Sequence, residues 1–147
     1  MPKAELLLSF PALRGKKLDL SPATLNYNCL AYALGDTNNW WQPGHRFFYW
    51  PDGFSHDVSV ETVTSIIKLH GYTKKVSRES VERYRAAVAI YSIGQEWTHF
   101  AKWSNGLWSS KIGEDHDIKG VTLEDLEGRL YGKVTAILCR PLSDKRA

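Results

Sequence analysis

The second half of the chain carries three successive runs of strand-like pattern. Residues 86–93 are almost continuously apolar, and residues 97–103 alternate large apolar with polar side chains. Residues 107–112 follow Asn105-Gly106, a dipeptide typical of the tight turn between two strands of a hairpin. We therefore expect three consecutive antiparallel strands that form a meander.

The first half contains a short apolar run with helical character. Residues 29–34 are apolar and are followed by Gly35, which suits the left-handed position just past a helix end. Either Asn26 or Asn28 is suited to cap the start of this helix. Cys29 would then lie in or beside its first turn.

A second helix is expected between Ser59 and Gly71, because apolar residues recur there at helical spacing and Ser59 is suited to cap its start. Shorter elements are expected as a strand over residues 72–76, a brief helix over 80–85, a helix opened by a Thr122–Asp125 capping box, and a last strand over 134–139. The order predicts an α+β fold in which N-terminal helices pack on a mainly antiparallel four- to five-stranded sheet. A length of 147 residues fits a single domain, 1–147.

A long irregular segment, residues 36–59, separates the two helices and is rich in aromatic side chains. A loop of this length inside a compact domain is more often functional than idle. Trp40, Trp41 and Trp50 are therefore candidate substrate-binding residues, with packing inside the protein as the alternative interpretation.

Composition and charge exclude several classes of protein. Hydrophobic residues make up 43% and charged residues 24%, which is ordinary for a globular domain, and the net charge is +3 without a basic stripe. We therefore expect no nucleic-acid partner and no membrane partner. The only apolar run near the start is too short for a signal peptide or a membrane span, so a cytoplasmic protein is the default expectation, with export by a signal-less route left open.

Two cysteines, Cys29 and Cys139, lie far apart and neither belongs to a paired-cysteine motif. We therefore expect no metal and no cofactor, while one disulfide between the two cysteines stays open. Cys139 is interpreted as a structural residue. Cys29 is the candidate nucleophile, since a helix start and a neighbouring imidazolium lower a thiol pKa.

His99 is the best placed of the five histidines to act as the base, because it falls inside a predicted central strand. The residue that orients its ring is expected to be Asp115 or His116 in the following polar loop, or else Ser110 on the next strand. For the oxyanion, the backbone N–H of Cys29 is the natural first donor, and the side chain of Asn28 or Asn26 is a possible second.

The order of a Cys opening a helix, a His on an antiparallel strand and a polar residue on the next segment resembles papain-like cysteine hydrolases, especially their compact bacterial peptidase and amidase branch. From Ser21 to Leu142 the chain is also similar to a family of small bacterial proteins that look like relatives of those hydrolases. The residues that carry this similarity are Tyr27-Asn28-Cys29, Ala31-Tyr32-Ala33-Leu34-Gly35, Trp40-Trp41, Tyr49-Trp50-Pro51, Glu61-Thr62, Gly71-Tyr72, Thr98-His99, Gly106-Leu107-Trp108-Ser109-Ser110-Lys111, Gly128 and Tyr131-Gly132. One departure is Lys119-Gly120 after Asp117-Ile118, where a histidine commonly follows, so that histidine's role would pass to His116 or be lost.

The resemblance implies a hydrolase that cleaves an amide or peptide bond through a Cys–His pair and an acyl-enzyme, as a peptidase, amidase or deamidase. It implies a peptide, a protein or a cell-wall peptide as the substrate. The alternative is a non-catalytic binding module on the same frame, whose aromatic loop recognises a glycan or a protein partner.

Overall fold

The computed structural model describes residues 10–13, 19–20, 24–44, 46–112 and 117–141. In chain order the elements are η1 (Pro11–Leu13), β1 (Asp19–Leu20), α2 (Cys29–Ala33), α3 (Val60–Leu69), β2 (Lys74–Val76), η2 (Val81–Arg83), β3 (Ala86–Ile93), β4 (Glu96–Ser104), β5 (Leu107–Lys111), β6 (Asp117–Val121), α4 (Leu123–Leu126) and β7 (Lys133–Cys139). The fold is therefore α+β, as the sequence pattern predicted.

One antiparallel sheet of seven strands organises the molecule, in the order β1-β6-β5-β4-β3-β7-β2. Its centre is the predicted meander of β3, β4 and β5. Asn105 and Gly106 connect β4 to β5 with positive φ angles of 55° and 77°, which is the backbone of a type I′ turn. The meander prediction is confirmed.

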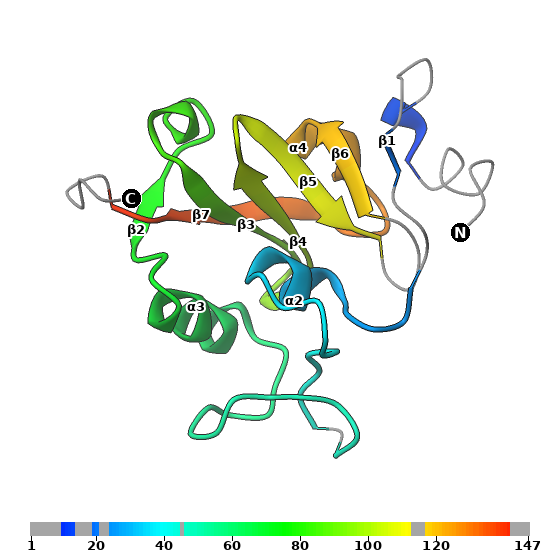
Figure 1. Ribbon diagram of the computed structural model, residues 1–147, viewed down its shortest axis with the longest axis vertical. Helices are drawn as coiled ribbons and strands as arrows, with labels where there is room; N and C mark the ends of the chain where they lie inside the picture. The colour runs from blue at the N-terminus through cyan, green and yellow to red at the C-terminus, as the bar shows by residue number, and fades with distance from the viewer. Residues whose placement is uncertain (1–9, 14–18, 21–23, 45, 113–116, 142–147) are drawn as a thin grey trace.

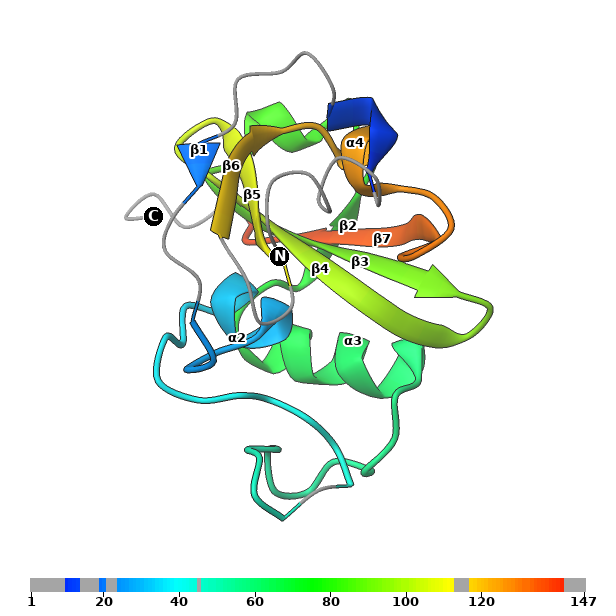
Figure 2. The same cartoon turned by 90° about the vertical axis from the view of Figure 1, so that its right-hand side faces the viewer.

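Helices cover both faces of the sheet (Figures 1 and 2). Along β3, Val88 and Ile90 point into a cluster with α2 and α3, whereas Ala87, Ala89 and Tyr91 point into a second cluster with η1 and α4. Because successive side chains of a strand alternate between faces, each central strand contributes to two separate cores.

Two strands were not predicted, and the expected count of four to five strands is wrong. A polar loop was expected after residues 107–112, yet in the described part of that segment Asp117–Val121 is strand β6, paired with β5 on one side and β1 on the other. The β6 segment contains Asp117, Lys119 and Gly120, which hide any apolar alternation, and β1 has only two residues. The brief helix expected over residues 80–85 is the three-residue 3-10 turn η2.

Local capping signals predicted the helix starts correctly. The Ser59 hydroxyl accepts a hydrogen bond from the Thr62 N–H at 3.1 Å at the start of α3. Thr122 and Asp125 form the reciprocal capping box of α4.

The long segment between α2 and α3 has little regular structure. Within residues 36–44 and 46–59, β-pairing is limited to isolated bridges, one of which joins Trp41 to Tyr49. No helix in the described part of the chain is long and apolar enough to cross a membrane.

Gly132 provides a test of the packing between the β7 approach and the end of β3. Its φ is 74°, and a β-carbon built there would overlap the carbonyl oxygen of Ser92. Gly94 also has a positive φ, of 63°, but a β-carbon at that position would meet nothing within 4 Å. We expect Gly132→Ala to lower the free energy of unfolding by roughly 1–3 kcal/mol more than Gly94→Ala. Both substitutions place an alanine at a positive φ, but only the β-carbon of Gly132→Ala overlaps neighbouring atoms. Urea denaturation of the two variants measures this difference, and equal losses would contradict the packing described.

Candidate active site

Cys29 is the first residue of α2, and its backbone is held by Asn28. The Asn28 side-chain oxygen caps the helix by accepting from the Ala31 N–H at 3.2 Å, and the same oxygen accepts from the Trp41 N–H. The Asn28 amide nitrogen donates to the Trp41 carbonyl oxygen at 2.6 Å. Asn28 thus ties the helix start to the long segment that follows it, and only 7% of Cys29 is exposed.

The helix α2 lies against β4 and β5 at the place where these strands separate. Their ladder runs from Ser104 and Leu107 only as far as Lys102 and Ser109. Beyond it, the Ser110 hydroxyl donates to the Phe100 carbonyl oxygen at 2.8 Å in place of a backbone pair. The backbone N–H of Phe100 faces the Cys29 sulfur, so the thiol lies at this opening.

His99 is buried, with 1% of its surface exposed, and lies on the sheet face opposite α2 together with Tyr91. Its Nε2 contacts the Ser110 hydroxyl. One ring face stacks on Tyr131, with the ring centroids 3.8 Å apart and an angle of 4° between the planes. The imidazole is therefore fixed on its face and at one nitrogen, and Nδ1 is the nitrogen that the Ser110 contact leaves unused.

Cys29 and His99 approach the same opening from the two faces of the sheet. They share two neighbours, since Phe100 follows His99 in the chain and faces the sulfur, while Ser110 bonds both to His99 and to the Phe100 carbonyl. The structure thus brings the predicted residues His99 and Ser110 into contact, and it places Cys29 next to them through Phe100, on the other face of the sheet.

Burial controls the protonation of both groups. It raises the pKa of the Cys29 thiol to about 11, although the backbone N–H groups of Phe100, Leu30 and Cys29 itself and the charge of Lys111 act in the opposite direction. Burial also lowers the pKa of His99 to about 3. The expected low thiol pKa is therefore wrong for this structure, because a five-residue helix cannot compensate for desolvation. At neutral pH the site holds a neutral thiol and a neutral imidazole.

A second polar group lies beside the site on the α2 face and was missed at the sequence level. The fully buried Lys111 donates to the Thr24 carbonyl oxygen at 2.9 Å, and its ammonium group lies 5.5 Å from the centre of the Tyr27 ring. Its cross-strand partner, Asp117, accepts from the Tyr27 hydroxyl at 2.7 Å. The feature that marks this group is the burial of Lys111, which cannot be recognised from the sequence alone.

The other predicted site residues have different outcomes. Asp115 and His116 lie outside the described residues, so Ser110 is the predicted orienter that the structure places against His99. Asn26 is exposed, and its backbone N–H binds the Thr24 hydroxyl. Asn28 acts as the cap of α2, with one amide hydrogen already used by Trp41.

The tryptophans predicted to bind substrate are largely packed inside the protein. Trp41 is 4% exposed and donates its ring N–H to Asp36 at 2.8 Å. Trp50 is 7% exposed and donates to the Ser55 carbonyl oxygen. Trp40 is half-buried. The burial of Trp41 and Trp50 leaves little ring surface for a ligand.

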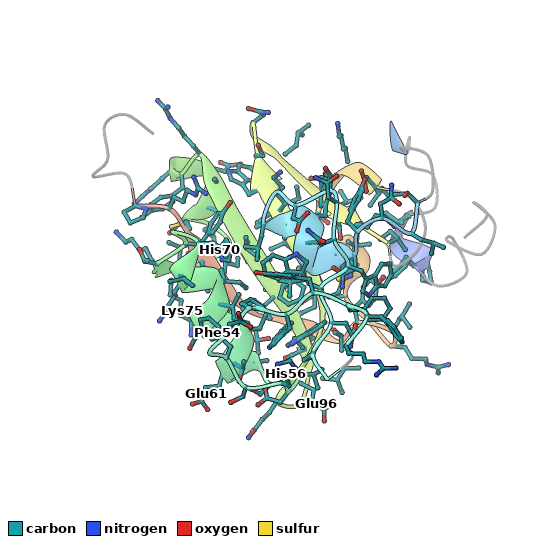
Figure 3. All side chains as sticks on the ribbon, turned by 60° about the horizontal axis from the view of Figure 1, so that its bottom comes forward. Phe54, His56, Glu61, His70, Lys75 and Glu96 are labelled. Carbon is teal, nitrogen blue, oxygen red and sulfur yellow. The ribbon has the colours of Figure 1, made fainter. Side chains whose placement is uncertain are left out.

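The described histidines outside the site, His56 and His70, serve local structure. His56 accepts from the Gly44 N–H at 3.1 Å, and His70 at the end of α3 bonds to the Ile66 carbonyl oxygen. Figure 3 places His70 at the opposite end of α3 from Glu61. Among the residues that the structure describes, no group of three or more His, Cys, Asp and Glu side chains is arranged to hold a metal ion.

The two cysteines are separate free thiols. Cys139 is fully buried in the cluster with η1 and α4, whereas Cys29 belongs to the cluster with α2 and α3. They pack on opposite faces of the sheet, so this structure holds no disulfide between them.

The lowered pKa of His99 predicts a pH-dependent stability. Between pH 6.5 and about 3 the unfolded chain binds a proton on this histidine that the folded protein does not, so stability is fully present above pH 6.5 and falls as the pH decreases. The slope approaches about 1.4 kcal/mol per pH unit. We expect His99→Gln to show a shallower decline between pH 6.5 and 5 in urea titrations. Parallel curves for the two proteins would contradict a buried neutral His99.

Residues 19–139 match the family model described as a domain of unknown function, DUF7689. No curated protein and no solved structure matches the chain. The matched segment runs from β1 to β7 and includes Cys29, His99 and Ser110, and the chain therefore belongs to the DUF7689 family.

Proposed function

We propose that this protein is a papain-like cysteine hydrolase that cleaves an amide or peptide bond, with Cys29 as nucleophile, His99 as base and Ser110 as positioning residue. The observation that carries the proposal is the position of Phe100, whose amide faces the Cys29 sulfur and whose carbonyl binds the Ser110 hydroxyl that contacts His99. A thiol at a helix start, an imidazole and a hydroxyl that holds the imidazole are the parts that nucleophilic acyl transfer requires.

The contact between His99 Nε2 and Ser110 gives the two ring nitrogens different roles. Because Nε2 is engaged by the hydroxyl, Nδ1 is the position from which the ring exchanges a proton with the thiol. Stacking on Tyr131 restricts tilting of the ring and so supports the same orientation. Positioning of this kind contributes to rate by fixing the reacting groups before the substrate arrives.

The neutral state of both groups determines when the proton moves. As the Cys29 sulfur attacks the carbonyl carbon, the thiol proton passes to His99 Nδ1 and the carbonyl oxygen becomes the oxyanion. The oxyanion then collapses, the C–N bond breaks, and the amine leaves with the proton from His99. Water attacks the thioester in the same way, and the products are a carboxylic acid and the free thiol.

Backbone amides supply the groups that would stabilise the oxyanion. The N–H groups of Cys29, Leu30 and Phe100 all face the sulfur region, and fixed amide donors cost no reorganisation during reaction. The resemblance to papain-like hydrolases extends the proposed substrates to cell-wall peptides, isopeptides and protein glutamines.

Acylation by an activated ester tests the proposed nucleophile. With p-nitrophenyl acetate we expect acetyl transfer to Cys29, detected by peptide mass spectrometry, and release of nitrophenolate that Cys29→Ala abolishes. Cys139→Ala is the matched control and is expected to retain the reaction, because Cys139 lies in the other core. His99→Ala should slow acylation about 10²–10⁴-fold through loss of the base.

Acetylation of both cysteines at equal slow rates would overturn the proposal. The role of Ser110 has its own control, since Ser110→Thr retains a hydroxyl whereas Ser110→Ala does not. We expect acylation to fall in Ser110→Ala and to recover in Ser110→Thr. A uniform loss of folding in both variants, seen by circular dichroism, would instead assign Ser110 a structural role.

A non-catalytic binding module is the second candidate, favoured by the burial of Cys29 and His99. In that case neither thiol would react with the ester in the folded protein, and Cys29→Ala would leave ligand binding unchanged.

A further inference from the structure

A groove runs beside the β4–β5 hairpin, on the face of the sheet that α4 covers. It consists of two adjoining cavities, of about 300 Å³ and about 430 Å³, whose linings share Glu82, Trp103 and Gly106. Strands β4, β5 and β6 form its floor, and η2 and α4 form its walls. Figure 2 shows α4 on the opposite side of the sheet from α2 and α3. This hairpin groove includes neither Cys29 nor His99 in its lining.

Trp108 brings an unused hydrogen-bond donor into the hairpin groove. Only 8% of this residue is exposed, and it lines the first cavity. The ring N–H of Trp103 donates to the Tyr84 carbonyl oxygen at 3.0 Å, whereas that of Trp108 donates to no acceptor in the described part of the chain. Trp108 Nε1 is not one of the buried atoms that lack a partner, so solvent reaches it. A donor held in a nearly buried ring and open to a cavity is suited to an acceptor on a ligand.

Other polar groups of the lining include both donors and acceptors. Glu82 is exposed and borders both cavities, and Arg78 is held beside Glu124 by an ion pair. Arg85 and Asn105 add donors along the second cavity. A ligand in the hairpin groove therefore meets carboxylate, guanidinium, amide and indole groups. Hydrogen bonding, and not one sign of charge, is the basis of recognition that this lining offers.

Apolar groups complete the lining. Val81, Val121 and Leu107 border the first cavity, and 52% of Leu107 is exposed. A β-carbon at Gly106 or Gly120 would meet nothing within 4 Å, so the backbone there lies next to open space. The hairpin groove thus combines an apolar surface with a rim of hydrogen-bonding groups, as sites for small ligands do.

We propose that the hairpin groove binds a short neutral saccharide, which accepts a hydrogen bond from Trp108 and donates one to Glu82. Each hydroxyl of a sugar both donates and accepts, and the hydroxyls surround a ring with apolar C–H faces. This distribution matches the apolar surface and mixed polar rim of the groove. Because the rings of Trp103 and Trp108 are nearly buried, recognition depends on the hydroxyl contacts and not on ring stacking.

An extended peptide is the competing occupant, because its carbonyl groups also accept from an indole N–H. A peptide backbone presents one donor and one acceptor per residue. A sugar ring presents several hydroxyls within the same length, which suits the number of polar groups around the first cavity. The lining therefore favours the saccharide.

Titration of the full chain with uncharged sugars tests binding. The probes are glucose, galactose and N-acetylglucosamine, with sorbitol as the open-chain control. We expect at least one sugar to bind with a Kd on the order of 1–10 mM, and sorbitol to bind at least about tenfold more weakly because its chain must be ordered. Saturable binding of none of the sugars, or equal binding of sorbitol, would overturn the proposal. Tighter binding of N-acetyl-trialanine amide would assign the groove to a peptide and overturn the saccharide.

The indole N–H signals in a nitrogen–proton correlation spectrum locate the bound sugar, since each of the six tryptophans gives one. We expect the Trp108 signal to shift, because its N–H gains an acceptor. The Trp97 N–H is also without a partner in the described residues, but it is buried in the cluster with α2 and α3 and should not shift. A shift of the Trp97 signal without one of Trp108 would place the sugar elsewhere and contradict the hairpin groove.

Substitutions test the two proposed contacts. Trp108→Phe removes the donor and is expected to weaken sugar binding about three- to tenfold, with Trp97→Phe as the matched control. Because Trp108 packs in the core, Glu82→Ala at an exposed position supplies a second test and should weaken binding about tenfold. Its control is Glu79→Ala, exposed and outside the lining. Unchanged binding in Trp108→Phe and Glu82→Ala, or equal losses in the controls, would overturn the proposal.

Sugar binding is independent of the proposed hydrolase, because Cys29 packs in the other cluster. We expect Cys29→Ala to keep the sugar affinity of the unmodified protein, whatever its effect on ester acylation. Loss of sugar binding in Cys29→Ala would contradict a separate site in the hairpin groove.

Discussion

The incomplete ladder between β4 and β5 is the constraint on which the candidate site depends. Had the strands paired along their full length, the Phe100 amide and carbonyl would both be used by β5. Instead the Ser110 hydroxyl satisfies the carbonyl, and the amide faces the Cys29 sulfur. A single serine thereby satisfies a buried backbone group, contacts His99 and keeps the opening that α2 approaches.

The burial of this site explains why its thiol and imidazole, which are reactive groups, are both uncharged at neutral pH. Charged forms are costly in a dry interior, and both Cys29 and His99 adopt their neutral forms there. Donors around the sulfur are in place, yet they act against a larger desolvation effect. Admission of a substrate carbonyl or of water would change this balance, because the desolvation penalty depends on what fills the space around the sulfur.

Patterns confined to short stretches of the chain were predictable, whereas long-range pairings were not. The Asn105-Gly106 turn, the Ser59 cap and the Thr122–Asp125 box follow from neighbouring residues, and all three are present. Strand β6 was missed because its polar residues Asp117 and Lys119 hide the alternation, and because it lies between β5 and β1, of which β1 is near the start of the chain. The contact of Ser110 with His99 could not be predicted with certainty, because the pattern of residues leaves the strand register uncertain by one residue. A shift of one residue would move Ser110 to the other face of the sheet. The thiol pKa was misjudged because sequence shows the helix start but not the depth of burial.

The two ends of the sheet bear on how the molecule behaves at high concentration. Exposed strand edges are templates for pairing with other chains, and proteins limit that hazard with short or charged edge strands. Here β1 has two residues and β2 has three, of which Lys74 and Lys75 are exposed. A seven-stranded sheet thus offers little edge for intermolecular β-pairing. In the described residues, this arrangement limits edge-to-edge pairing between folded chains.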